Sequence, residues 1–305
     1  MATSTTFAPS GITVELRENL DEVITNIAPT DTVFLSNISK KKIQGTYYEW
    51  LEDTLAAAAN NAVTEGNDAV YATIVAPTRT GNYVQQSAKW FKISDVLEAV
   101  DKAGMKSQVA YTTTQKLKEL SRDMEYALLN NSTATATDPR ALKGLKGWIT
   151  TNGYNYTTGT ASTTLTESSF VSTIQLAWAQ GGNVDMVLAP AAMKKKISAF
   201  TGQSRLTINT EADSKGIIAA VDLYESDFGV VKIYASRFMA TDDSASYDSI
   251  FFLEKSKWQL GQLIPTKTDK LAKTGLGDGI QISNAYTLIA RSEKANARLK
   301  NLNNG

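Results

Sequence analysis

The stretch SQVAYTTTQKLKELSRDMEYALLNN, residues 107–131, decides how this sequence folds. Its large apolar side chains Leu117, Leu120, Met124 and Leu128 recur at the spacing of one helical face, and charged residues fill the other faces. At 1.5 Å per residue this helix would be roughly 35 Å long. A helix of that length with a single apolar stripe predicts an elongated protein in which the helix packs along one side only.

Two strand-like runs precede the helix within residues 40–95. The first, KKKIQGTYYEWLEDTL, and the second, NYVQQSAKWFKISDV, are both rich in aromatic and β-branched residues, which favour strands. Between them lie about thirty residues rich in Ala, Asn, Gly and Pro. So long a connection is uncommon inside a compact domain, and we expect a functional excursion made of a hairpin and a long loop.

Residues 1–39 have the composition of an arm rather than of a domain. They are rich in Ser and Thr, contain Pro9 and Pro29, and carry one Arg against five carboxylates. Such a segment is poorly stabilised by itself, so we expect it to lie against a neighbouring subunit. We further expect its acidic residues to contact a basic surface of that neighbour, with the tail over 291–300 as a candidate.

The part of the chain after the helix has the pattern of an α/β unit. Residues 165–200 are expected to alternate helix, strand and helix. Gly181–Gly182 can end the first helix, a buried strand, VDMVLA, follows at 184–189, and Pro190 suits the first turn of the second helix. Further strands are then expected at 217–224, 229–235, 249–254, 257–264 and 280–292, and a basic tail at 293–305.

Composition excludes much of enzyme chemistry. The chain of 305 residues has no Cys and no His, which removes thiolate and imidazole catalysis, disulfides and the usual zinc and haem ligands. Lys plus Arg equals Asp plus Glu at 31 each, so net charge gives no reason to expect binding to nucleic acid or to a membrane. No segment is apolar enough to span a membrane, and the N-terminus does not resemble a signal peptide.

Short motifs give no catalytic, cofactor-binding or metal-binding candidate. The sequence GLGDG at 275–279 precedes a strand rather than a helix, so we interpret it as a flexible loop and not as a phosphate site. Ser39 and Lys42 lack the other motifs of a Ser-Lys acylase, and Asp242 with Asp243 lacks further metal ligands.

The order of segments resembles the Hong Kong 97 (HK97) fold of tailed-bacteriophage major capsid proteins. Both have an N-terminal arm, an extended loop, a long spine helix in a peripheral domain, and an axial α/β domain. Local strings make the chain similar to one branch, the SU10-type major capsid proteins. These strings are TYYEWLEDTLAAA (46–58), Glu65–Gly66, APTRTGN (76–82), EAVDKAGMKSQVAY (98–111), KELSRDMEYALL (118–129), RALKGLKGWITTN (140–152), SDFGVVKIYASRF (226–238) and LAKTG (271–275).

The resemblance implies an α+β fold with five parts. They are an arm (1–39), the extended loop with its base strands (40–95), a peripheral domain with the spine helix (96–150), an axial domain (151–262), and return strands of the peripheral domain followed by the tail (263–305). It implies a structural protein of the virion, made in the host cytoplasm, that forms hexamers and pentamers of an icosahedral shell around double-stranded DNA. A cellular shell protein of the same fold, an encapsulin, and a carboxylate-dependent enzyme such as a glycosidase are the alternatives.

The resemblance also implies partners and contacts. With only about 40 residues before the first hairpin strand and no coiled-coil heptads there, we expect a separate scaffolding protein, as well as a portal and, optionally, a cement protein. Residues 54–82 contain no Lys, so the Lys–Asn cross-link of the founding member of the fold is not expected, and the shell should be non-covalent. Candidate inter-subunit contacts are Glu65, Arg79, Trp50, Glu18, Asp21 and Arg298.

Overall fold

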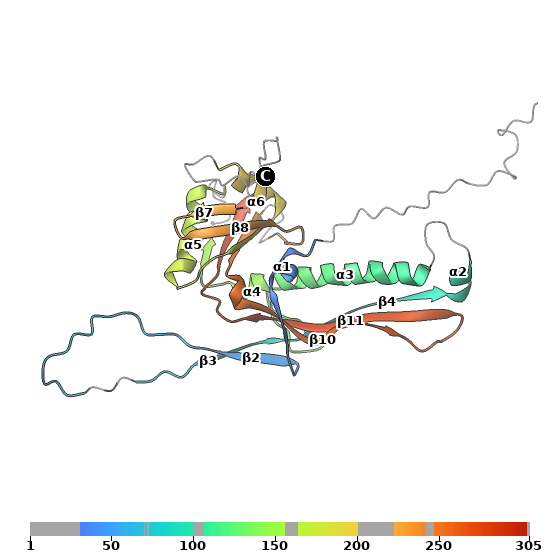
Figure 1. The fold of residues 1–305 in the computed structure, drawn as a ribbon, viewed down its shortest axis with the longest axis horizontal. Coiled ribbons are helices and arrows are strands. Elements are labelled where there is room, and N and C mark those ends of the chain that lie inside the picture. The colour runs from blue at the N-terminus through green and yellow to red at the C-terminus, as the bar shows by residue number, and fades with distance from the viewer. Residues whose placement is uncertain are drawn as a thin grey trace, which may run out of the picture.

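The computed structural model describes residues 31–69, 71, 73–100, 107–155, 164–200, 223–241 and 247–303. Helices and strands are mixed, and the described strands form three sheets of four, six and two strands. The long helix and the four-stranded sheet form one elongated body, the six-stranded sheet rises from one end of it, and the two-stranded hairpin extends away from both (Figure 1). The predicted α+β class is confirmed.

The long helix α3 runs from Gln108 to Asn130. It begins where the Ser107 side chain accepts a hydrogen bond from the backbone N–H of Ala110 at 3.2 Å. The Glu98 carboxylate, in the short helix α2 (Asp95–Ala99), accepts two further N–H groups of the first turn. The predicted apolar stripe is confirmed, because Leu120, Met124 and Leu128 are buried.

The four-stranded sheet has the strand order β1-β10-β11-β4. Its strands are β1 (Ser39–Lys42), β10 (Trp258–Lys270), β11 (Gly277–Ala290) and β4 (Gln85–Ser94). Strand β11 runs antiparallel to β10 and β4, and β1 runs parallel to β10. Helix α3 lies along one face of this sheet (Figure 1), where Leu120 packs with Ile280 and Ile282.

The six-stranded sheet has the order β5-β12-β9-β6-β8-β7. Its strands are β5 (Gly153–Asn155), β12 (Ala297–Asn303), β9 (Tyr247–Leu253), β6 (Met186–Ala189), β8 (Gly229–Ala235) and β7 (Leu223–Ser226). Helices α5 (Glu167–Ala179) and α6 (Ala191–Ser198) pack on it. Phe170 of α5 lies against Phe252 and Tyr224, with ring centroids 4.9 and 5.1 Å away, so an aromatic cluster fills this core.

A second apolar core joins the two sheets. It contains Phe34 of helix α1 (Val33–Asn37), Leu128 of α3, Trp148 of helix α4 (Leu145–Trp148), Phe251 of β9 and Trp258 of β10. A 3-10 turn, η2 (Lys255–Lys257), leads from β9 into β10. Because this core takes residues from both halves of the chain, the peripheral and axial parts are packed into one body.

Two boundaries differ from those expected from the sequence. Only β2 (Tyr47–Glu52) and β3 (Thr78–Tyr83) form the hairpin, while β1 and β4, expected as its base strands, belong to the four-stranded sheet. The expected tail over 293–305 is wrong for Ala297–Asn303, which form β12 between β5 and β9 in the axial sheet. The basic residues among Ala297–Asn303 indicated an exposed tail, although these residues form a largely buried strand.

Candidate assembly surfaces

Within the described residues, the β2–β3 hairpin is held to the body near its base. Trp50 packs on Trp148 with ring centroids 5.5 Å apart, and its Nε1 donates to Glu52 at 2.9 Å. Asn82 of β3 is fully buried, and its amide donates to the carbonyls of Lys143 and Leu288, both at 2.9 Å. Trp50 was expected to contact another subunit, but its main contacts lie inside its own chain.

The described residues of the loop 53–77, which joins β2 to β3, are exposed to solvent. The loop extends far from the rest of the molecule (Figure 1). Its large apolar side chains are open to solvent, with Leu55 99% and Ile74 94% exposed, and Val63, Tyr71 and Val75 are exposed as well. A soluble subunit has no internal reason to display these side chains together, so the loop is the leading candidate for an interaction surface.

The two charged candidates of the excursion, Glu65 and Arg79, lie in the loop and on strand β3, respectively. Glu65 is exposed in a turn with Gly66, whose positive φ of 76° is readily adopted by glycine. Arg79 lies on β3, and its guanidinium is 3.7 Å from the carboxylate of Glu49 on β2. Both partners are largely exposed, so this pair contributes little to the stability of the subunit.

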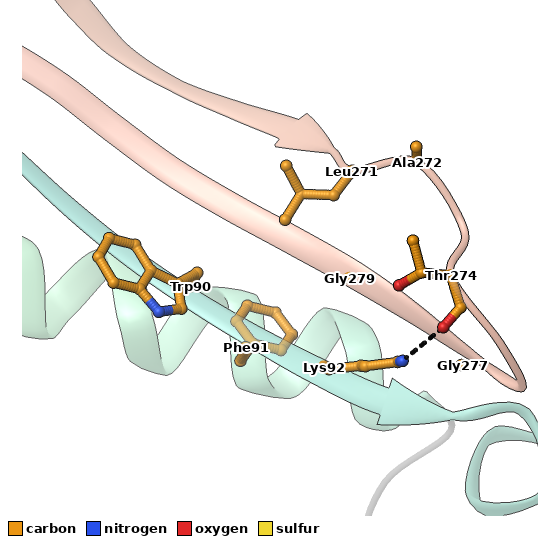
Figure 2. Close-up of a pocket in the computed structure, with 8 residues that line it drawn as sticks. All are labelled: Trp90, Phe91, Lys92, Leu271, Ala272, Thr274, Gly277 and Gly279. Carbon is orange, nitrogen blue, oxygen red and sulfur yellow. Dashed lines mark hydrogen bonds between the residues drawn. The ribbon is translucent and has the colours of Figure 1, made fainter.

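A shallow pocket of about 190 Å³ lies at the far end of the four-stranded sheet (Figure 2). Trp90 on β4 and Leu271 after β10 stand over a floor made by Gly277 and Gly279 of β11, on the face opposite α3. Lys92 closes one side by donating to the carbonyl of Thr274 at 3.3 Å. Trp90 is 71% exposed, so this end of the sheet is a second candidate interaction surface.

Sequence reasoning missed this pocket because GLGDG was interpreted as a flexible loop. Gly275 has a φ of 112° and does lie in a turn, but Gly277 and Gly279 begin β11. The residues Gly277 and Gly279 alternate, as neighbours on one face of a strand do, which was the available signal. Nearby, a hydrogen bond from Lys273 to Asp95 at 2.9 Å, with Asp278 close by, raises the pKa of Lys273 and fastens the turn to α2.

Arg298 is not the exposed contact that we expected. It lies on β12 and is only 4% exposed, with its guanidinium over the ring of Phe251 at 5.4 Å and donating to the carbonyl of Lys146. Its contacts therefore join the axial sheet to α4 within one subunit. The other two candidates, Glu18 and Asp21, lie outside the described residues, as does the pair Asp242–Asp243.

The part of the chain that the structure describes offers no cluster of three or more acidic residues placed to hold a metal ion. Among the described helices, none combines the length and the apolar character needed to cross a membrane.

A family model described as SU10 major capsid protein matches residues 2–303. The chain belongs to this family. It is a major capsid protein of the tailed-phage type, a structural protein of the virion, and the HK97-like fold implied by the sequence is confirmed.

Other capsid and shell proteins are similar to this chain in sequence or in fold. The major capsid protein of Escherichia phage Phieco32 is 24% identical over 310 residues, covering 83% of this chain and 84% of that protein. A solved chain of Mycobacterium phage Bobi is similar with a TM-score of 0.64 at 10% identity, covering 96% of this chain and 97% of that chain. The holo-SrpI encapsulin complex from Synechococcus elongatus PCC 7942 also gives a TM-score of 0.64, at 9% identity, covering 94% and 93%. The fold alone therefore does not separate phage capsids from encapsulins, whereas the family match does.

Proposed function

We propose that this capsid protein assembles into hexamers and pentamers of a closed icosahedral shell around double-stranded DNA, after synthesis in the host cytoplasm. The observation that carries the proposal is the loop of residues 53–77. Among its described residues, the large apolar side chains are exposed, while the hairpin that carries the loop is firmly anchored at its base. A rigidly anchored and exposed loop is suited to reach a second copy of the chain.

Covering the loop would stabilise the shell through burial of apolar surface. Each Å² of apolar surface removed from water contributes roughly 25 cal/mol, so a few large side chains supply several kcal/mol per subunit. Repeated around a capsomer, this contribution makes assembly cooperative without covalent links. The loop itself carries the carboxylates Asp53, Glu65 and Asp68 and has no basic residue, so we propose that a neighbour's Lys or Arg side chains contact it.

The partners beyond self-assembly are also proposals. A separate scaffolding protein would guide closure, a portal would occupy one vertex, and a cement protein is an optional addition. Glu65 and Arg79, which the excursion carries, and Glu18 and Asp21, in the arm, remain the proposed inter-subunit contacts. Arg79 faces a neighbour's carboxylate in this proposal, in exchange for the weak pair with Glu49.

Size and contents of the particles test the proposal. The purified chain should run as capsomers or megadalton shells in size exclusion, and electron microscopy should show closed shells with local sixfold and fivefold clusters. A small stable oligomer with hydrolytic activity would support the enzyme alternative instead. Particles isolated from their natural source should hold nuclease-protected DNA and bear tails, whereas protein-filled, tailless shells would support the encapsulin alternative.

A further inference from the structure

The C-terminal end of the long helix α3 holds three different parts of the molecule through three polar side chains. Glu125, Asn130 and Asn131, here called the α3 junction, each bond to a segment that leads elsewhere: the arm, the link out of the axial sheet, and the base of the hairpin. Polar side chains are common at a helix end, but Glu125 is fully buried and all three side chains bond to segments outside the helix.

Glu125 holds helix α1, which belongs to the C-terminal part of the arm. Its carboxylate is fully buried and accepts the backbone N–H groups of Phe34 at 2.7 Å and Leu35 at 2.8 Å. These are first-turn amides of α1, which no side chain of α1 or its N-cap satisfies. Burying a carboxylate is costly, and these two hydrogen bonds offset part of that cost while they tie α1 to α3.

Asn130 holds the link that leaves the axial sheet after β8. Its amide donates to the carbonyl of Phe238 and its carbonyl oxygen accepts the N–H of Ala240, both at 2.7 Å. The pair of bonds fixes the direction of the link as well as its distance from the helix. Arg122, two turns back on the same helix, lies over the ring of Phe238 at 5.6 Å and supports the same link.

Asn131 holds the base of the hairpin. Its amide donates to the side chain of Gln85 at 3.2 Å and to the carbonyl of Leu142 at 3.1 Å. The same oxygen of Gln85 accepts the N–H of Leu142 at 3.3 Å. Gln85 comes two residues after the end of β3, so the bonds tie the root of the hairpin to the end of α3.

The segment between Leu142 and Trp148 is pressed between the helix and the hairpin. Gly144 donates its N–H to the carbonyl of Asn131 at 2.9 Å, and a Cβ at Gly144 would lie only 2.6 Å from the carbonyl of Leu128. On the other side, Lys143 exchanges hydrogen bonds with the buried Asn82 of β3 through both its N–H and its carbonyl. The hairpin is therefore in rigid contact with the end of α3 through one tightly packed segment.

We propose that the α3 junction fixes the angles at which helix α1, the axial sheet and the hairpin are held against the long helix, and that it thereby sets the curvature of the shell. The inference rests on the proposed function only for its last step, because the angles belong to the single subunit. Glu125, Asn130 and Asn131 are positioning residues: each is bonded inside its own subunit, and their effect on neighbouring subunits acts through the parts that they orient.

The experiment measures the hairpin angle in the unassembled chain and the particle diameter in the same variants. Since the chain has no Cys, spin labels attached to Leu51→Cys on the hairpin and Lys118→Cys on an exposed position of α3 report one distance. Gln85→Ala removes the acceptor of Asn131, whereas Gln85→Glu keeps an oxygen there and is the matched control. We expect a narrow distance distribution for the parent and for Gln85→Glu, and a broadened one for Gln85→Ala.

The arm and the axial link are tested by further variants. Glu125→Gln places an amide against one of the two N–H donors and should speed amide exchange at Phe34 and Leu35. Glu119→Gln, at a half-buried position whose carboxylate pairs with Lys116 of the same helix, should leave the exchange at Phe34 and Leu35 unchanged. Asn130→Ala should speed amide exchange at Ala240, whose N–H the Asn130 side chain accepts. This variant tests the contact with the axial link independently of the hairpin.

Shell diameter completes the test. Gln85→Ala should lose the single diameter that the parent and Gln85→Glu show in electron microscopy. A Gln85→Ala distance distribution as narrow as the parent's would contradict the proposal that the α3 junction fixes the hairpin angle. A changed distance distribution with an unchanged single shell diameter would contradict the proposal that this angle sets the curvature. If the parent forms no shell at all, the proposed function fails, and the distance measurement still decides whether the junction fixes the hairpin.

Discussion

The hairpin with its loop and the six-stranded axial sheet show two opposite uses of apolar side chains in one chain. Leu299 of β12 is fully buried between neighbouring strands, whereas Leu55, just beyond β2, is almost fully exposed. The axial sheet contains its own partners, whereas the described apolar side chains of the loop beyond the hairpin lie in solvent. The first region is thus stabilised inside the subunit, and in the proposed shell the loop would be covered by another subunit.

The largest expected effect comes from deleting the loop. Replacing residues 54–77 with an Asn-Gly turn keeps β2 and β3 paired but removes the exposed apolar side chains. We expect assembly to be abolished while the melting temperature of the subunit changes little. Size exclusion and calorimetry measure the two quantities, and a deletion variant that still forms normal shells would show that the loop is not the interaction surface.

Denaturing detergent should separate the subunits completely. Residues 54–82 contain no Lys and the chain contains no Cys, so neither a Lys–Asn cross-link from the loop nor a disulfide joins the subunits. Mature particles boiled in detergent should run as one band near 33 kDa. A ladder of dimers, pentamers and hexamers would mean that the hairpin region is linked covalently to its neighbours.

One pair of identical substitutions compares the two regions directly. Leu299→Ala should lower the free energy of unfolding of the subunit by about 2–5 kcal/mol, because it leaves a cavity in the axial core. Leu55→Ala should leave that free energy unchanged to within about 0.5 kcal/mol and should instead raise the concentration needed for assembly. Urea unfolding of the subunit measures the first effect and light scattering the second; equal effects on unfolding would remove the contrast.

Glu125 allows the interior to be perturbed by pH alone. Burial raises the pKa of its carboxyl, and the hydrogen bonds from Leu35 and Phe34 only partly oppose the shift. Because the folded pKa lies above the unfolded one, the contribution of Glu125 to stability is lost as the pH rises through the folded pKa and is fully present below the unfolded value. As the pH falls from above the folded pKa to below the unfolded pKa, the melting temperature of the parent should therefore rise relative to that of Glu125→Gln.

Carboxylates common to both proteins cancel in this comparison, so the pH dependence of the difference reports on Glu125 alone. A difference between parent and Glu125→Gln that does not vary with pH would contradict the assigned shift.

The smallest effect is expected at Arg79. Arg79→Ala removes an exposed pair with Glu49, so the subunit should lose no more than about 0.5 kcal/mol. If Arg79 contacts a neighbour's carboxylate, the stability of shells of the Arg79→Ala variant should depend less on salt concentration than that of parent shells. The reason is that salt screens such a contact in the parent, and the variant lacks it. Arg79→Lys, which keeps the charge, is the control, and identical salt profiles for all three proteins would leave Arg79 without a role between subunits.

Several features were determined by the sequence alone, because they depend on near neighbours along the chain. The apolar period of 107–131 determined α3, and a long polar and small-residue stretch between two aromatic runs determined the excursion. The absence of Cys and His needs no structure at all. Local strings, each modest by itself, were enough in their order to indicate the family.

Only the tertiary structure decided which distant segments lie together. Ala297–Asn303 have the composition of a basic tail, yet they complete the axial sheet because β5 and β9 offer edges to both sides of them, and this buries Arg298. Likewise, nothing near Gln85 in sequence predicts its bond to Asn131, nor does the neighbourhood of Glu125 predict α1 as its partner. Periodicity reports which face of an element is apolar, whereas the partner of a polar group is set by chain segments far away in sequence, which only the folded chain brings within hydrogen-bonding distance.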